Sequence, residues 1–306
     1  MYNVPILFII FKRKETALKS FQQIKAVKPK KLYLAGDGAR PKIKEELQNV
    51  ESTRQAILDE IDWNCEVHTL FHKQNFGCSK GVFSAINWFF EREELGIILE
   101  DDCIAEISFF DYAKELLLRY KDDNRIGMIA GTNQIRNHEI PYSYCFSKYA
   151  ACWGWATWKR AWNNMDLTMN FLESVSCKRN ILYNRGYYAK EIDRWLYQIS
   201  YIEKKRVSSW DWQWYFSLAS QNQLCIFPKV NLISNIGNDK DATHTGLGNI
   251  YIKSHPIKFP LTHPKYIVPN ETFDRYFYKT DNSLSNRLKR IIPYNFKQKI
   301  KKIKKR

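Results

Sequence analysis

The sequence lacks the cysteine patterns of disulfide-rich and zinc-binding proteins. Its seven cysteines are an odd number, lie scattered along 306 residues and include no C-x-x-C pair, so neither a disulfide framework nor a zinc knuckle is indicated. The opening apolar run, in MYNVPILFIIFKRKE, is shorter than a transmembrane helix of about 20 residues. It also lacks the basic leader and small-residue cleavage site of a signal peptide. We therefore expect reduced thiols, a first buried strand and a cytoplasmic protein.

Acidic residues are missing from residues 287–306, which contain ten Lys or Arg. The formal charge of the chain is +16, so most of the excess belongs to this tail. The segment RLKRIIPYNFKQKIKKIKKR mixes cations with apolar residues, a pattern typical of a basic amphipathic segment on an anionic membrane surface. A nucleic-acid contact, which we consider unlikely, and a disordered solubilising end are the alternatives. We predict a basic tail over 281–306 and a peripheral location on the inner face of the cell membrane.

Linkers rich in glycine, serine or proline are also absent, as are internal repeats. With 44% hydrophobic and 26% charged residues, the chain can bury a full core as one large domain or two modest ones. Residues 1–135 alternate strand-like runs with helix-like stretches near 15–27, 42–61, 79–92 and 108–120. Such alternation predicts an α/β fold, with a mostly parallel central sheet and helices on both faces.

Polar residues follow several of these expected strands. Asp37, Asn75, the carboxylates of residues 100–102 and Asn133 all come where a strand is expected to end. In open parallel sheets, ligands bind outside the carboxyl ends of the strands. The sequence therefore predicts a binding site at this edge of the sheet.

The stretch GIILEDDCI places Glu100, Asp101 and Asp102 together at the end of a buried strand. Adjacent carboxylates are unfavourable unless a cation or hydrogen bonds compensate them. Mg²⁺ and Mn²⁺ prefer oxygen ligands and commonly share a carboxylate with substrate phosphates, and they neutralise charge that develops on a departing diphosphate. The alternative is a solvated turn that caps the next helix; the buried approach favours a metal site.

These segments resemble those of a known enzyme family. IILEDDC resembles the DxD-type motif of glycosyltransferases of the GT-A fold, in the Glu-Asp-Asp variant of N-acetylglucosaminyltransferase I and related bacterial enzymes. FHKQNFGCSKGVFSAINWFF resembles a segment of glycosyltransferase family 2. YAACWGWATWKRAW and NLISNIGNDKDATHT are similar to segments of bacterial nucleotide-diphospho-sugar transferases. The resemblance covers residues 3–250, in the family's order, and implies a GT-A-type, Rossmann-like sheet.

The resemblance implies two halves that share this sheet. Residues 1–135 would bind the nucleotide sugar, and residues 136–280 would hold the acceptor and the catalytic base. Eight of the ten tryptophans lie between Trp153 and Trp214, which makes the second half a Trp-rich subregion.

The resemblance also implies roles for individual residues on the donor side. Phe11, Lys12 and Asp37 would hold the base and ribose, although Asp37 also fits an ordinary turn. Asn75 and Lys80 match positions near the base and diphosphate, although a solvated helix lysine is an equal alternative.

The same resemblance implies that the acidic triplet and His244 bind the metal. Asp102 would ligate Mn²⁺ or Mg²⁺ directly, Asp101 would contact the ribose or a metal-bound water, and Glu100 would support them. His244, in DATHTG, would be a second metal ligand or a diphosphate contact, with a lone surface histidine as the alternative.

Two further candidates lie in the Trp-rich half. An inverting transfer needs a carboxylate that takes the proton of the acceptor hydroxyl. Asp211, between tryptophans in SSWDWQWYFS, is the strongest candidate, because partial desolvation would raise its basicity. A helix-capping acid is the alternative, and Asp193 is the reserve candidate. Trp155, with Trp153, resembles the aromatic wall of the family's sugar site, although tryptophans are more often core residues.

The interpretation is a metal-dependent, inverting enzyme of bacterial surface polysaccharide or lipopolysaccharide synthesis. It would move a sugar from a nucleoside diphosphate, with a UDP-sugar favoured, to a saccharide or lipid-linked saccharide. A nucleotidyltransferase that makes an activated sugar is one alternative, but FIIFKRKETA has no glycine for the usual phosphate loop. A non-catalytic carbohydrate-binding protein is another, and it leaves the three carboxylates unexplained.

Overall fold

A computed structural model describes residues 1–135, 139–170, 173–185, 189–203, 210–237 and 252–281. The strands are β1 (Ile6–Ile10), β2 (Lys31–Gly36), β3 (Glu66–Phe71), β4 (Leu95–Glu100), β5 (Cys103–Ala105), β6 (Ile126–Ala130), β7 (Tyr144–Ser147), β8 (Trp155–Trp158), β9 (Leu224–Pro228) and β10 (Ile233–Asn235). The helices are α1 (Lys14–Val27), α2 (Glu46–Asp59), α3 (Gly77–Phe90), α4 (Ser108–Arg119), α5 (Lys159–Trp162), α6 (Val175–Arg185), α7 (Ala189–Glu203), α8 (Asp211–Ser220) and α9 (Glu271–Asp281).

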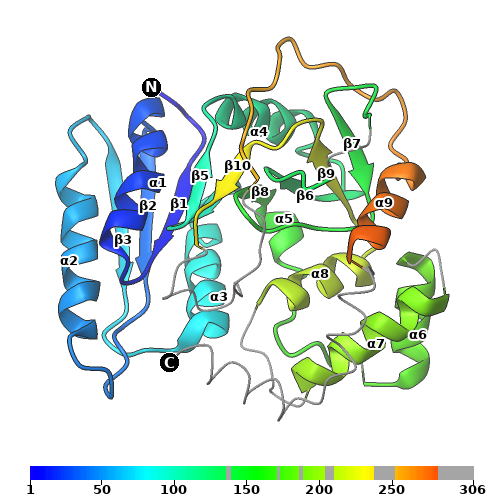
Figure 1. Cartoon of the computed structure of the whole chain (residues 1–306), viewed down its shortest axis with the longest axis horizontal. Coiled ribbons are helices and arrows are strands. Elements are labelled where there is room, and N and C mark those ends of the chain that lie inside the picture. The colour runs from blue at the N-terminus through cyan, green and yellow to red at the C-terminus, as the bar shows by residue number, and fades with distance from the viewer. Residues whose placement is uncertain (136–138, 171–172, 186–188, 204–209, 238–251, 282–306) are drawn as a thin grey trace.

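One eight-stranded sheet runs through the molecule in the order β3-β2-β1-β4-β8-β6-β9-β7 (Figure 1). The pairs among β3, β2, β1 and β4, and the pair β6–β9, are parallel. Strands β8 and β7 pair antiparallel with their neighbours. Strand β8 lies between β4 and β6, so strands of both halves of the chain form one continuous sheet. The predicted α/β class, with a mostly parallel central sheet, is confirmed.

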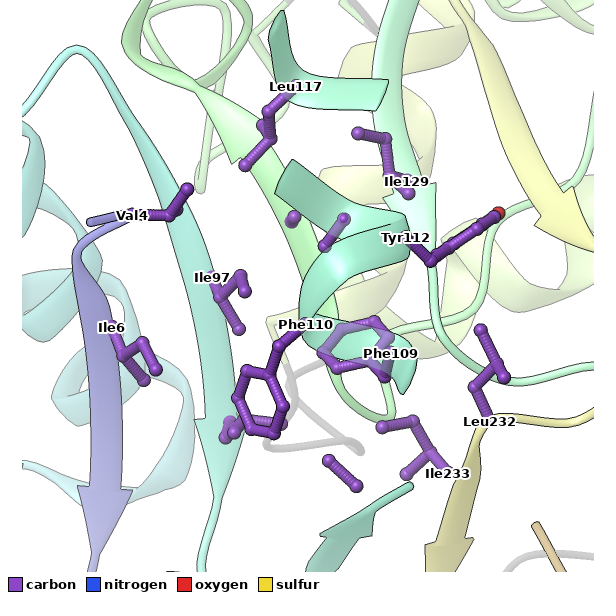
Figure 2. Packing of buried hydrophobic residues seen from close by; sticks show 14 of the residues in the cluster. Val4, Ile6, Ile97, Phe109, Phe110, Tyr112, Leu117, Ile129, Leu232 and Ile233 are labelled. Carbon is purple, nitrogen blue, oxygen red and sulfur yellow. The ribbon is translucent and has the colours of Figure 1, made fainter. Parts of the chain in front are cut away.

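Helices cover both faces of this sheet, because successive strand residues point to opposite sides. In β1, Ile6 and Phe8 pack into the cluster that includes residues of α1 and α4, whereas Leu7 packs with residues of α3 and α8. Figure 2 shows the first cluster, in which Phe110 of α4 lies near Ile97 of β4 and Phe109 lies on the side of Ile233. The two cores fix the sheet, and so fix where its strand ends lie.

The predicted helices of the first half are present, with shifted ends. The expected helix over 42–61 is shorter, since α2 begins only at Glu46. Glu45, just before it, has a left-handed φ of 65°, which keeps the preceding residues out of the helix. No helix in the described ranges is long and apolar enough to cross a membrane.

A small antiparallel sheet of β5 and β10 adjoins the acidic stretch. Asn235 pairs with Cys103, and the amide of Ile236 donates to the carbonyl oxygen of Asp102 at 2.9 Å. This pairing brings β10, which is 132 residues further along the chain at Asn235 and Cys103, next to the end of β4.

Candidate functional site

A cavity of about 360 Å³ opens at the carboxyl ends of β1, β2, β3 and β4. Its walls include the residues that follow three of these strands, namely Phe11, Lys12, Arg13, Asp37, His72 and Asn75, and the carboxylates Glu100, Asp101 and Asp102. Most of the side chains that the sequence placed at strand ends therefore meet in one space. We call it the donor-side cavity.

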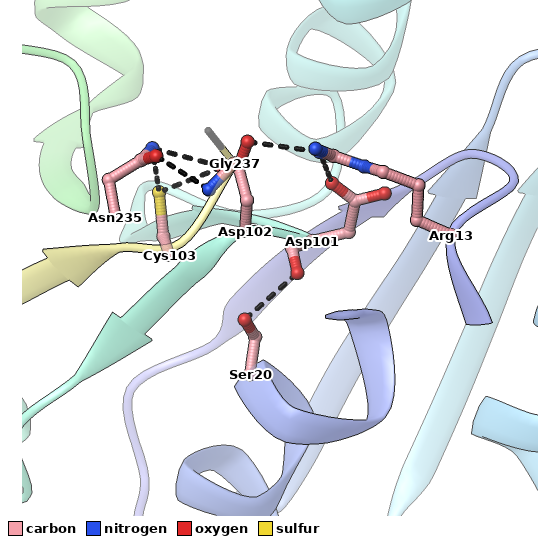
Figure 3. A network of polar contacts seen from close by, with 7 residues as sticks. All are labelled: Arg13, Ser20, Asp101, Asp102, Cys103, Asn235 and Gly237. Atoms are coloured by element: carbon pink, nitrogen blue, oxygen red, sulfur yellow. Dashed lines mark hydrogen bonds and ion pairs between the residues drawn. The ribbon is translucent and has the colours of Figure 1, made fainter. Parts of the chain in front are cut away.

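Asp101 and Asp102 lie in the turn between β4 and β5, and Arg13 joins them (Figure 3). Its Nη2 atom donates to Asp101 Oδ1 at 2.5 Å and to Asp102 Oδ2 at 2.9 Å. Asp101 is only 5% exposed, and Ser20 Oγ donates to its backbone oxygen at 2.9 Å. The guanidinium supplies the compensating charge that such crowded carboxylates need.

The second strand of the small sheet completes the surroundings of Asp102. Asn235 Nδ2 donates to Asp102 Oδ1 at 3.2 Å, as Figure 3 shows. A Cβ atom on Gly237 would lie 2.1 Å from Asp102 Oδ2, so only glycine lets the chain pass this carboxylate so closely.

Burial and mutual repulsion shift the acid-base behaviour of this group. Desolvation, followed by the charges of Asp102, Asp101 and Asp211, raises the pKa of Glu100. Desolvation also raises the pKa of Asp101, although Arg13 opposes this shift. Burial alone would lower the pKa of Arg13, but the two aspartates raise it above its ordinary value. Burial and the neighbouring charges therefore disfavour the ionised forms of Glu100 and Asp101.

A hydrogen-bonded loop and two basic side chains also line the donor-side cavity. The carboxylate of Asp37 accepts hydrogen bonds from the backbone N–H groups of Gly38, Phe76 and Gly77, at 2.8–3.1 Å. Asn75 Nδ2 donates to the carbonyl oxygen of Gly38 at 2.6 Å. Both side chains line the cavity, but these bonds also hold its wall in place.

Two cations, Lys12 and Arg40, line the same cavity. Lys12 Nζ lies 3.1 Å from the carboxylate of buried Glu46, which also pairs with Arg40. The Arg40 guanidinium lies 5.8 Å from the centre of the Phe11 ring. Lys80 is exposed and is not among the described residues that line the cavity.

A second cavity, of about 260 Å³, lies beside the first in the Trp-rich half. Trp153 lines both. Half of the described residues that line the second are aromatic, namely Tyr149, Trp153, Trp195, Trp212, Tyr215, Phe227 and Phe277, and Arg194 and Asp211 also line it. We call it the acceptor-side cavity.

Asp211 is the first residue of α8 and an acid of the acceptor-side cavity. Its Oδ1 atom is buried and has no hydrogen-bond partner among the described residues. Its charge contributes to the raised pKa of Glu100, which lines the donor-side cavity. Asp193, the reserve candidate, is exposed on α7.

The structure corrects the placement of Trp155. This side chain is fully buried, and its ring stacks on Trp210 with 5.6 Å between centres. It lines neither cavity in the described part of the chain, because β8 lies in the middle of the sheet and turns Trp155 into the core. Trp153, just before the strand, takes the place on the cavity wall.

His244 falls in residues 238–251, outside the described residues. Within the described ranges, no group of three His, Cys, Asp or Glu could hold a metal ion. A metal with substrate phosphates needs only one or two protein carboxylates, however. Asp102 lines the cavity, and the neighbouring Asp101 Oδ2 is buried without a hydrogen-bond partner among these residues. These oxygen donors suit a hard divalent cation.

Sequence reasoning missed Arg13, Arg40 and Asn235. Arg13 had a signal, because it continues the basic run FKR after the first strand. Arg40 and Asn235 had none, since their places depend on a loop and on the pairing of β10 with β5.

No protein-family model and no curated protein sequence matches this chain. Its fold is similar to that of a mannosyltransferase from Pyrobaculum calidifontis in complex with GDP-Man and Mn²⁺, at a TM-score of 0.37 and 11% identity, over 72% of this chain and 70% of that one. It is similar to S. aureus TarS 1-349, at 0.34 and 10%, over 59% and 55%. It is also similar to HddC from Yersinia pseudotuberculosis, at 0.33 and 10%, over 56% and 86%.

Proposed function

We propose that the protein transfers a sugar from a nucleoside diphosphate to a saccharide acceptor, with inversion and with Mn²⁺ or Mg²⁺. The observation that carries this proposal is the arrangement of two cavities that share Trp153. One holds crowded carboxylates with nearby cations, and the other holds aromatic rings and Asp211. A transferase needs both a charged donor site and an adjoining acceptor site.

The donor-side cavity suits a nucleoside diphosphate. Phe11 offers a ring near the cationic Lys12 and Arg40, and Asp37 and Asn75 also line the cavity. Asp102 lines it too, and it would ligate the cation. That cation would neutralise charge on the leaving diphosphate, and Asp101 and Glu100 would lie beside it.

The acceptor-side cavity suits a sugar, because flat aromatic faces stack on sugar rings. Asp211 would take the proton of the acceptor hydroxyl while that oxygen bonds to the anomeric carbon. The bond from this carbon to the diphosphate oxygen breaks, and the nucleoside diphosphate leaves. General-base help of this kind contributes about 10²–10⁴ in rate.

Glycan synthesis at a membrane fits the remaining features. We propose a saccharide or lipid-linked saccharide of bacterial surface polysaccharide or lipopolysaccharide as the acceptor, with a UDP-sugar as donor. The basic tail over 287–306 lies outside the described residues, and it would hold the enzyme at the inner face of the cell membrane. His244, also outside them, would be the second metal ligand.

Replacing Asp211 tests this assignment. Purified protein with a panel of nucleotide sugars and Mn²⁺ should hydrolyse one of them slowly, and a saccharide acceptor should accelerate its consumption. Asp211→Asn should lower transfer by about 10²–10⁴ while nucleotide-sugar binding persists. Asp122→Asn, an equal change at an exposed acid after α4, should leave transfer unchanged.

The alternatives give different results. Full transfer by Asp211→Asn would place the base elsewhere. Formation of a nucleotide sugar from a nucleoside triphosphate and a sugar phosphate, without sugar transfer, would show a nucleotidyltransferase instead.

A further inference from the structure

A single nitrogen atom of the Arg13 guanidinium contacts both aspartates. Nη2 makes both ion pairs (Figure 3). Among the described residues, its Nε and Nη1 groups have no hydrogen-bond partner, and they are not among the buried atoms without a partner. Arg13 lines the donor-side cavity. Both edges of a guanidinium that make two parallel hydrogen bonds include Nη2, so release of one aspartate would leave an edge free to bind a phosphate group.

The two ion pairs are unequal. The contact to Asp101 is 2.5 Å, and that side chain is 7% exposed. The contact to Asp102 is 2.9 Å, and that side chain is 17% exposed. Asp102 is thus the partner that the guanidinium can release at lower cost, while it stays on Asp101.

We propose that Arg13 competes with the divalent cation for Asp102 and binds the diphosphate of the donor once that carboxylate is released. The diphosphate in this proposal rests on the proposed function. Without a donor, Arg13 holds Asp102 and keeps metal affinity low. With a donor, the phosphates supply negative charge for both cations, and Arg13 becomes a positioning residue for the leaving group.

Charge balance gives the reason. A divalent cation on Asp102 repels a guanidinium that shares the same oxygen, and this repulsion is strong at a part-buried site. Two phosphates offset it. Metal and diphosphate should therefore bind cooperatively, and linkage requires each to increase the affinity of the other by the same factor.

Mn²⁺ binding by the full chain, measured by electron paramagnetic resonance of free Mn²⁺, tests this proposal without turnover. Arg13→Gln should bind Mn²⁺ alone at least about tenfold more tightly than the unchanged protein, within the range of coupling between neighbouring sites. UDP should strengthen Mn²⁺ binding by the unchanged protein about tenfold, and that of Arg13→Gln much less.

A control and a second variant separate this effect from general charge loss and misfolding. Lys14→Gln removes the same charge at the next, exposed residue, and its Mn²⁺ affinity should match that of the unchanged protein. The double variant Arg13→Gln/Glu15→Gln removes one charge of each sign, the acid being exposed, which keeps the net charge, and it should also bind Mn²⁺ more tightly.

Unchanged or weaker Mn²⁺ binding by both Arg13 variants would overturn the proposal. An increase of Mn²⁺ affinity in Lys14→Gln equal to that in Arg13→Gln would also overturn it. This result is independent of the transferase assignment. Tight Mn²⁺ binding by Arg13→Gln, in a protein that consumes no nucleotide sugar, would support the role of Arg13 and refute the proposed function. Mn²⁺-stimulated transfer, with no increase of Mn²⁺ affinity in Arg13→Gln, would support the proposed function and refute the role of Arg13.

Discussion

At the scale of residues, two tryptophans that are two positions apart have different surroundings. Trp153 is partly buried and lines both cavities, whereas Trp155 is fully buried and stacks on Trp210. The sequence predicted that both tryptophans line the sugar site, and among the residues that the structure describes only Trp153 of this pair lines a cavity. The difference depends on where β8 begins, and a short apolar segment does not reveal which of its aromatic residues the sheet buries.

Alanine substitutions should separate these roles. Trp155→Ala leaves a large void in the core and should lower the free energy of unfolding by about 3–5 kcal/mol. Trp153→Ala should cost much less stability, and it should weaken binding on both sides of the site because its ring is shared. Urea unfolding and nucleotide-sugar titration measure the two effects. Equal losses of stability in both variants would contradict this distinction.

At the scale of elements, the strand ends were predictable and the connections between them were not. Apolar runs followed by Asp37 or by the triplet 100–102 predicted which side chains meet at the sheet edge, because parallel strands share one carboxyl edge. The place of Arg13 beside the triplet and the return of Asn235 to Asp102 come from tertiary pairing. The basic run FKR marks Arg13 as a candidate, but local sequence patterns do not predict either contact.

The first turn of α2 gives a pH prediction. Hydrogen bonds and charge from Arg40, with Lys12, lower the pKa of Glu46 to about 2. This pKa lies below the value near 4.3 of an unfolded chain, so the pairing stabilises the fold fully above about pH 4.5. That contribution, on the order of 2 kcal/mol, should disappear as the pH falls towards 2.

Replacing Glu46 provides the check. Glu46→Gln should be less stable than the unchanged protein at pH 7, and the difference should shrink as the pH falls from 4.5 towards 2. Thermal unfolding over this range measures it. A difference that stays constant with pH would show that charge on Glu46 is not the cause.

At the scale of the whole molecule, the sequence predicted the fold class, because alternating strand and helix patterns leave few arrangements other than a covered, mostly parallel sheet. The antiparallel strand β8 within it was not predicted, since sequence order says little about insertion between strands. The charge of the chain is also a whole-molecule property, with ten Lys or Arg within residues 287–306.

The tail can be tested by deletion. Removing 287–306 should weaken sedimentation with vesicles that contain anionic lipid, since each basic residue near such a surface contributes about 1 kcal/mol. Turnover on a soluble acceptor should stay the same. Unchanged sedimentation of the truncated protein would remove the membrane role of the tail.

The central claim is that Asp102 holds a divalent cation against the diphosphate of a sugar donor. Calorimetric titration of the full chain with UDP-sugars, with and without Mn²⁺, tests it most directly. We predict that one UDP-sugar binds at least about tenfold more tightly with Mn²⁺, and that Asp102→Asn loses this gain. Equal binding with and without Mn²⁺, or a full gain in Asp102→Asn, would contradict the claim.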